Sequence, residues 1–208
     1  MSMRALLVGL LLLGSLILNG CAVSRTVEMP ESARTIVTHP RASWGAQPPV
    51  SPMKSHRIER ITIHHTATYQ RPDRSIEDKL RGLQAFSQRV DSLGDGRLKP
   101  AWADVPYHFY IDVHGQIAEG REVGYPGDTN TAYDPAGHVL IVLEGNFEEE
   151  DLNDEQRTSL LALTRVLAQH WHISADRIAA HRDFADTLCP GQALYDWLSH
   201  LRAALNQR

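Results

Sequence analysis

The sequence predicts a mixed α/β (α+β) fold in which a central mixed β-sheet is flanked by helices. Segments that alternate as strands do and segments with apolar residues at helical spacing follow one another along the chain. The expected order is strand, helix, hairpin, strand, helix, strand, helix. Residues 139–143 are apolar at every position, which is typical of a strand covered on both faces. Helices on both sides of the sheet would provide that cover.

The first expected strand is residues 60–65, where β-branched and polar residues alternate up to the pair His64-His65. Successive side chains of a strand point to opposite faces, so at most one of the two histidines is expected to be a ligand, and alternation does not say which. A helix should follow, capped by Ser75 and continuing until Gly94. Its apolar positions are Leu80, Leu83, Phe86, Val90 and Leu93.

Residues 105–119 read as a β-hairpin, because alternation resumes on both sides of the turn sequence Asp112-Val113-His114-Gly115. Residues 120–137 are rich in Gly, Pro, Asn and Asp and contain no periodic pattern. Long loops inside compact domains are often functional, so this loop is expected to lie over the site.

The last third of the chain predicts two helices separated by a short strand. Asn153 is expected to cap the first helix, and residues 177–181 are branched enough to form the strand. Both helices carry a stripe expected to pack in the core. The stripes are Leu160, Leu163, Val166, Leu167 and Trp171 in the first helix, and Leu194, Trp197, Leu198, Leu201 and Leu205 in the second.

The amino terminus indicates export. Residues 1–20 have the build of a signal peptide, and Leu18-Asn19-Gly20-Cys21 resembles a bacterial lipobox, which implies lipidation of Cys21. An uncleaved anchor or an ordinary signal peptide is the alternative. Residues 21–38 are then a lipidated tether, and Ala22 in place of Asp favours the outer membrane. We expect a protein of the cell envelope that faces the periplasm and touches the membrane only through its lipid.

Residues 39–208 are enough for one domain with a real core, and we expect a monomer. The net charge of −4 becomes −5 once residues 1–20 are removed, because Arg4 is the one charged side chain among them. This balance argues against nucleic acid as a partner. Lipidation of Cys21 leaves Cys189 without a partner for an intrachain disulfide, and binding to a metal would protect its sulfur.

His64, His181 and Cys189 have the ligand types and the number expected of a catalytic zinc site, which keeps one position for water. A thiol hydrolase with Cys189 as nucleophile and His181 as base is the competing chemistry. Most of the other histidines are expected to have no role in catalysis or metal binding. His170 and His172 read as solvated or capping residues, and His39, His56, His114, His138 and His200 as surface residues.

Five blocks resemble one family, in that family's order. They are residues 41–46 (Arg-Ala-Ser-Trp-Gly-Ala), 63–67 (Ile-His-His-Thr-Ala), 105–111 (Val-Pro-Tyr-His-Phe-Tyr-Ile), 143–147 (Leu-Glu-Gly-Asn-Phe), and 180–183 (Ala-His-Arg-Asp) with 187–191 (Thr-Leu-Cys-Pro-Gly). The chain is thereby similar to the zinc-dependent N-acetylmuramoyl-L-alanine amidases of the type 2 amidase and peptidoglycan recognition protein fold.

The resemblance implies Zn²⁺ as cofactor, with His64, His181 and Cys189 as its ligands and His65 as a packing residue. It matches Tyr107 to the family's catalytic tyrosine, which would orient water or donate a proton late, and Thr187 to the residue that contacts the oxyanion. The implied activity is hydrolysis of the amide bond between N-acetylmuramic acid and L-alanine in peptidoglycan or muropeptides. The alternative is a peptidoglycan-binding lipoprotein without turnover.

A related branch of the family has a catalytic glutamate on the buried strand, where this chain has Val142. The neighbouring Glu144 is therefore expected to be structural. Substrate carboxylates would need a basic partner, and Arg121 and Arg182 are candidates that the spacing does not separate.

Overall fold

The computed structural model describes residues 27–207, so the expected signal peptide, Cys21 and the first part of the tether lie outside the described residues. A five-stranded sheet in the order β5-β4-β6-β1-β7 forms the centre. Its strands are β1 (Arg60–His65), β4 (Phe109–Ile111), β5 (Ile117–Glu119), β6 (His138–Leu143) and β7 (Ile178–Ala180). All neighbours pair in parallel except the β4-β5 hairpin, so the predicted mixed sheet is confirmed. Every residue of β6 is buried, as the apolar sequence of residues 139–143 predicts for that part of the strand.

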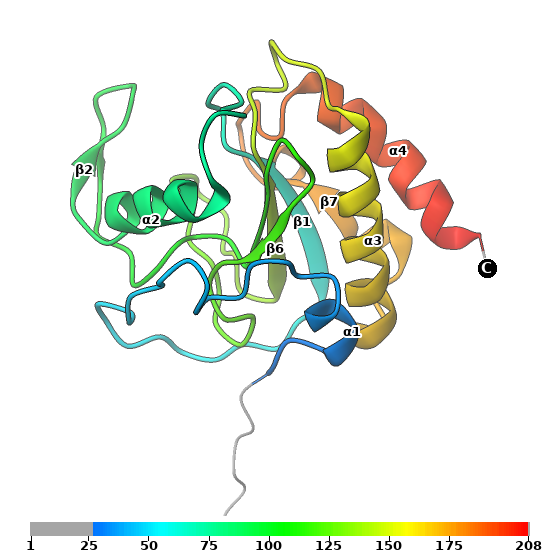
Figure 1. Cartoon of the computed structure of the whole chain (residues 1–208), viewed down its shortest axis with the longest axis horizontal. Coiled ribbons are helices and arrows are strands. Elements are labelled where there is room, and N and C mark those ends of the chain that lie inside the picture. The colour runs from blue at the N-terminus through cyan, green and yellow to red at the C-terminus, as the bar shows by residue number, and fades with distance from the viewer. Residues whose placement is uncertain (1–26, 208) are drawn as a thin grey trace, which may run out of the picture.

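Helices α3 (Asp154–Trp171) and α4 (Gln192–Asn206) cover one face of the sheet, where they lie side by side in Figure 1. The Asn153 side chain accepts the backbone N–H of Gln156 at 2.8 Å and so caps α3 as expected. Leu160, Leu163 and Leu167 of α3 pack with Leu194, Leu198 and Leu201 of α4 against Ile61, Ile63 and Ile141 of the sheet.

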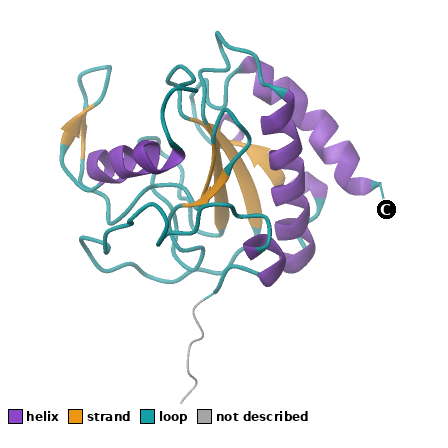
Figure 2. Ribbon diagram, viewed as in Figure 1, coloured by secondary structure: helices purple, strands orange, loops and turns teal. Residues whose placement is uncertain are grey.

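Helix α2 (Ile76–Ser87) covers the opposite face, so that the strands lie between two helical layers (Figure 2). Its N-cap is Ser75, whose Oγ accepts the backbone N–H of Asp78 at 3.2 Å. Ile76 and Leu80 pack on Trp44 and on Val142 of β6. The two faces of the sheet therefore belong to different clusters, and consecutive strand residues face different surroundings.

Helix α2 ends at Ser87, so the expected run to Gly94 is wrong. The Lys99 ammonium accounts for the early end, because it is fully buried and donates to the carbonyls of Ser87 at 2.8 Å and Arg89 at 2.9 Å. The following residues form an arm of two short strands, β2 (Asp91–Ser92) and β3 (Leu98–Lys99), which extends beyond α2 in Figure 1.

The structure also differs from the expected tether at residues 27–38. Helix α1 (Glu31–Arg34) packs its buried Ala33 into the core next to Met29, and Thr38 donates its backbone N–H to the carbonyl of Ile117 at 2.9 Å. The folded unit therefore begins before His39. Within residues 27–207, no helix combines the length and the apolar character needed to cross a bilayer.

Candidate metal centre

The pairing of β1 with β7 places two histidines side by side. Ile63 of β1 lies opposite Ala180 of β7, and the two strands are parallel. The next residue on each strand is His64 and His181, whose ring centroids are 4.6 Å apart. His181 begins a short 3₁₀ turn, η2 (His181–Asp183), so the chain changes direction directly after β7.

The loop after η2 folds back and brings Cys189 to these imidazoles. The Arg182 backbone N–H donates to the carbonyl of Cys189 at 2.9 Å, which closes the loop. Cys189 Sγ then lies 3.7 Å from His64 Nδ1. Donor atoms of His64, His181 and Cys189 all lie within 4.8 Å of one another, and all three residues are buried.

These residues fit a zinc ion in number, type and spacing. A tetrahedral site with bonds of about 2.0–2.3 Å separates its donor atoms by roughly 3.3–3.7 Å, so a small contraction of the trio would complete it. Burial lowers the pKa of His181 to about 4 and holds that of His64 well below its ordinary value, so both imidazoles offer a lone pair at neutral pH. Burial raises the pKa of the Cys189 thiol to about 12, and a bound cation would reverse that shift.

The trio lies in a pocket of about 460 Å³ that the other predicted site residues also line. Tyr107 and Thr187 contribute to its wall, and so do Asp128–Thr131 of the loop expected to lie over the site. The arm adds Leu93–Asp95 and Arg97. An Arg97 guanidinium N–H donates to the carbonyl of Asn130 at 3.3 Å, so arm and loop meet across the pocket.

Tyr107 and Thr187 each carry a hydroxyl group, and both residues line this pocket. The Tyr107 ring lies 5.3 Å from that of His64, and burial raises the pKa of its phenol, which therefore keeps its proton. Thr187 Oγ1 accepts the backbone N–H of Cys189 at 3.2 Å. This bond uses an oxygen lone pair and leaves the Thr187 proton free to donate.

His65 lies on the face opposite to His64. Its Nδ1 accepts the backbone N–H of Phe147 at 3.3 Å, and its ring stacks on that of Phe147. The position fits the expected packing role. His138 is buried and its Nδ1 lies 2.8 Å from Thr62 Oγ1, so its expected surface position is wrong. His172 is the C-cap of α3 and has a left-handed backbone conformation, which agrees with the capping role expected of it.

The hydroxyl groups of Thr129, Thr131 and Tyr133 were not among the predicted site residues, although they contact the two candidate histidine ligands. Thr131 Oγ1 lies 2.7 Å and Thr129 Oγ1 3.4 Å from His181 Nε2, and the Tyr133 hydroxyl lies 3.4 Å from His64 Nε2. Only the composition of the loop pointed to this segment.

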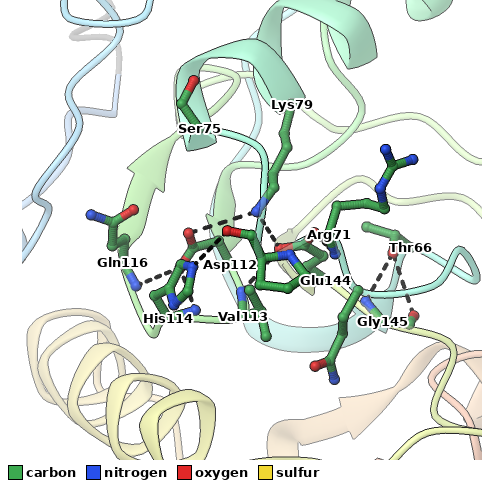
Figure 3. A network of polar contacts seen from close by, with 12 residues as sticks. Thr66, Arg71, Ser75, Lys79, Asp112, Val113, His114, Gln116, Glu144 and Gly145 are labelled. Carbon is green, nitrogen blue, oxygen red and sulfur yellow. Dashed lines mark hydrogen bonds and ion pairs between the residues drawn. The ribbon is translucent and has the colours of Figure 1, made fainter.

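Glu144 follows β6 and has the structural surroundings expected for it. It is buried and accepts from Lys79 Nζ at 2.8 Å and from the backbone N–H groups of Arg71 at 2.8 Å and Val113 at 2.9 Å (Figure 3). Asp112 completes the network 3.8 Å from the same ammonium. With its oxygens engaged in this way, Glu144 is poorly placed to act as a base.

Both arginines considered for substrate carboxylates already have protein acceptors. Arg121 is buried and holds the 120–137 loop through Asp128 and the carbonyls of Val105, Asp104 and Pro126. Arg182 donates to Glu148 at 2.9 Å, to Gln192 at 3.0 Å and to the carbonyl of Leu188. Neither guanidinium is free for a substrate in this structure.

Comparisons with known proteins agree on one family. A family model described as N-acetylmuramoyl-L-alanine amidase matches residues 54–192. Peptidoglycan recognition protein 1 of Mus musculus is 30% identical over 179 residues, which is 84% of this chain and 92% of the mouse protein.

Two solved structures of similar fold come from differently named proteins. Peptidoglycan recognition protein-LE in complex with tracheal cytotoxin has a TM-score of 0.66 and 27% identity over 79% of this chain and 93% of its own. The N-acetylmuramoyl-L-alanine amidase LysC from Clostridium intestinale has a TM-score of 0.58 and 28% identity over 78% and 95%. With a family model that spans most of the folded unit and these relatives, the chain belongs to the N-acetylmuramoyl-L-alanine amidase (Amidase_2) family.

Proposed function

We propose that this protein is a zinc-dependent amidase that hydrolyses the bond between N-acetylmuramic acid and L-alanine in peptidoglycan or muropeptides. The observation that carries the proposal is the meeting of three ligand donors within 4.8 Å, in a pocket that Tyr107 and Thr187 also line. Two hydroxyl groups beside a three-donor site are what amide hydrolysis needs, because the tetrahedral intermediate carries a negative oxygen and the leaving amine must gain a proton.

The relatives support the choice of substrate. The recognition protein of similar fold is described in complex with monomeric diaminopimelic acid-type peptidoglycan, and the clostridial neighbour is named as an amidase of the same bond. We transfer the polymer class and the bond to this chain on that basis, together with the three-donor set that this chain itself contains.

The chain's own residues would share the work as follows. Zn²⁺ held by the trio supplies a Lewis acid that activates water and polarises the scissile carbonyl. Tyr107 is a poor base because its pKa is raised, so it orients the attacking water or donates to the leaving nitrogen. Thr187 can donate its free proton to the developing oxyanion, a contribution worth about 3–4 kcal/mol for one well-placed donor.

A thiol hydrolase is the weaker reading of the same residues. A nucleophilic cysteine needs a lowered pKa, whereas burial raises that of Cys189. His64 Nδ1 and the backbone N–H of His65, 3.4 Å away, flank the sulfur. A binding protein without turnover remains the alternative that the experiment below separates from the enzyme.

The test uses the mature protein stripped of metal and then supplied with Zn²⁺. Soluble muropeptides and purified sacculi are incubated with each preparation, and the products are identified by mass spectrometry. We expect free stem peptides only after Zn²⁺ is restored, and none from Cys189→Ala or His181→Ala. Full cleavage by the metal-free protein would overturn the zinc proposal, and binding of muropeptide with no cleavage would favour the recognition function.

We also propose that Cys21 carries a lipid that anchors the domain in the envelope, at the outer membrane and facing the periplasm. The lipobox-like sequence that ends at Cys21 supports this location. Cys21→Ser should yield an unlipidated protein that leaves the membrane fraction. Persistent membrane fractionation of a cleaved Cys21→Ser protein would contradict the anchor.

A further inference from the structure

The outward-facing nitrogens of both candidate histidine ligands meet hydroxyl groups from one short segment of the 120–137 loop. His181 Nε2 lies 2.7 Å from Thr131 Oγ1, and His64 Nε2 lies 3.4 Å from the Tyr133 hydroxyl. The Tyr133 ring also packs on the ring of His181, with centroids 5.1 Å apart. Residues 129–133 therefore contact the Nε2 side of both imidazoles.

Thr129 extends this contact by one more hydroxyl group. Its Oγ1 accepts the backbone N–H of Thr131 at 3.1 Å and lies 2.8 Å from Thr131 Oγ1. Either threonine hydroxyl can be the donor in this contact, and in both cases Thr131 Oγ1 lies against Nε2 of His181. If His181 binds a cation through Nδ1, its Nε2 carries the proton and would donate it to Thr131 Oγ1.

The Nδ1 atoms are then the nitrogens left for a cation. His64 Nδ1 already faces Cys189 Sγ at 3.7 Å, which agrees with this orientation. The third candidate ligand has an outer partner as well, because the backbone N–H of His65 points at Cys189 Sγ from 3.4 Å. Each donor of the trio is oriented by a group behind it.

We propose that Thr131 and Tyr133 are positioning residues that set the affinity of the site for its cation, by fixing both imidazoles with Nδ1 toward the metal. This inference rests on the proposed function. Outer partners of ligating histidines fix the ring and raise its basicity, and their loss typically weakens metal binding about 10–100-fold. Thr131 should matter more than Tyr133, because its contact is the shorter one.

The test measures Zn²⁺ affinity directly, by competition of the metal-free protein with a chromophoric chelator. We expect Thr131→Val to raise the Kd about 10–100-fold and Tyr133→Phe to raise it about tenfold or less. Thr131→Ser should restore wild-type affinity because it keeps the hydroxyl. The matched controls are Thr158→Val, at an exposed position of α3, and Tyr125→Phe, on the same loop but outside this pocket, and both should leave the Kd unchanged.

The visible spectrum of the Co²⁺-substituted protein provides a second measurement. Its ligand-field bands should shift in Thr131→Val and return in Thr131→Ser, which a general loss of stability would not produce. Wild-type Kd and spectrum in Thr131→Val, or an equal loss in Thr158→Val, would overturn the positioning role while leaving the amidase proposal intact. A wild-type protein that takes up no Zn²⁺ would instead overturn the proposed function itself.

Discussion

His64 and His65 are neighbours in β1, yet their imidazoles lie on opposite faces of the sheet. His64 Nδ1 is 3.7 Å from Cys189 Sγ, whereas His65 Nδ1 accepts the backbone N–H of Phe147 at 3.3 Å. The pair therefore separates a metal-ligand role from a packing role within one dipeptide. Variants at the two positions should have different effects.

His64→Ala should lose Zn²⁺ binding and amide hydrolysis, because it removes one donor of three. His65→Ala should keep its metal and substantial activity but unfold more easily, since its ring stacks on Phe147 in the core. Zinc content, turnover and the midpoint of urea unfolding measure these effects together. Retention of zinc and turnover after His64→Ala, with their loss after His65→Ala, would reverse the assignment.

Thr187→Val should lower kcat about 100- to 1,000-fold, because it removes a hydroxyl that can donate to the oxyanion. Thr187→Ser keeps that hydroxyl and should retain most of the activity. Single-turnover kinetics with a soluble muropeptide provides the measurement. Since Thr187 Oγ1 also accepts the backbone N–H of Cys189, zinc content is the necessary control. An unchanged kcat in a fully zinc-loaded Thr187→Val protein would remove Thr187 from the mechanism.

Glu144→Gln should destabilise the fold by about 3–5 kcal/mol, because it takes away the nearer carboxylate partner of the buried Lys79 ammonium. The measurement is the free energy of unfolding in urea. Activity per folded molecule should stay close to wild type, as Glu144 is bonded within the fold. Asp73→Asn, at an exposed carboxylate, is the matched control and should change stability little. Lost turnover at full stability would instead give Glu144 a chemical role.

Stability should fall as the pH drops below about 6.5, and His108 should account for part of the slope. Burial lowers the pKa of His108 to about 3, and its Nδ1 is occupied by the backbone N–H of Leu140 at 2.8 Å. Between about pH 6.5 and 3, His108 is therefore protonated in the unfolded chain but neutral in the folded chain. Stability is complete above this window and is lost through it, by about 1.4 kcal/mol per pH unit for one such histidine.

Urea unfolding of the metal-free protein at several pH values measures that slope. His108→Gln should be less stable at neutral pH. The slope of its unfolding free energy against pH should be smaller by about 1.4 kcal/mol per pH unit, the contribution of one histidine. His200→Gln changes an exposed histidine and should leave the slope unchanged. A His108→Gln protein with the wild-type slope would show that other groups carry the acid sensitivity.

Local sequence patterns predicted those elements whose own residue types depend directly on burial or on helix capping. Residues 139–143 are apolar throughout because β6 is buried on both faces, and Ser75 and Asn153 cap the helices expected of them. The end of α2 was not predictable in this way. Val90 and Leu93 continue its helical spacing, but the ammonium of Lys99, from beyond the helix, binds the carbonyl of its last residue, Ser87, and that of Arg89 after it.

The candidate site likewise has residues that local sequence patterns predicted and residues that they did not. The types of His181 and Cys189 suggested a metal, but the choice between His64 and His65 needed the family resemblance, since alternation treats both faces alike. The register of β1 against β7 supplies the physical reason for that choice. Thr131 and Tyr133 lie in a loop whose path depends on Arg121 and its distant carbonyl partners, so no local pattern marks them.

The buried Lys99 ammonium has a consequence for how the wall of the pocket beside the candidate metal centre can vary in sequence. It binds the base of the arm to the carbonyls of Ser87, Arg89 and Pro100, while Leu93, Gly94, Asp95 and Arg97 at the tip line the pocket. Exchange of these tip residues would reshape one side of the pocket while Lys99 keeps the base of the arm in place. Under the proposed function, the arm is therefore the part of the pocket wall whose sequence can change which muropeptides fit.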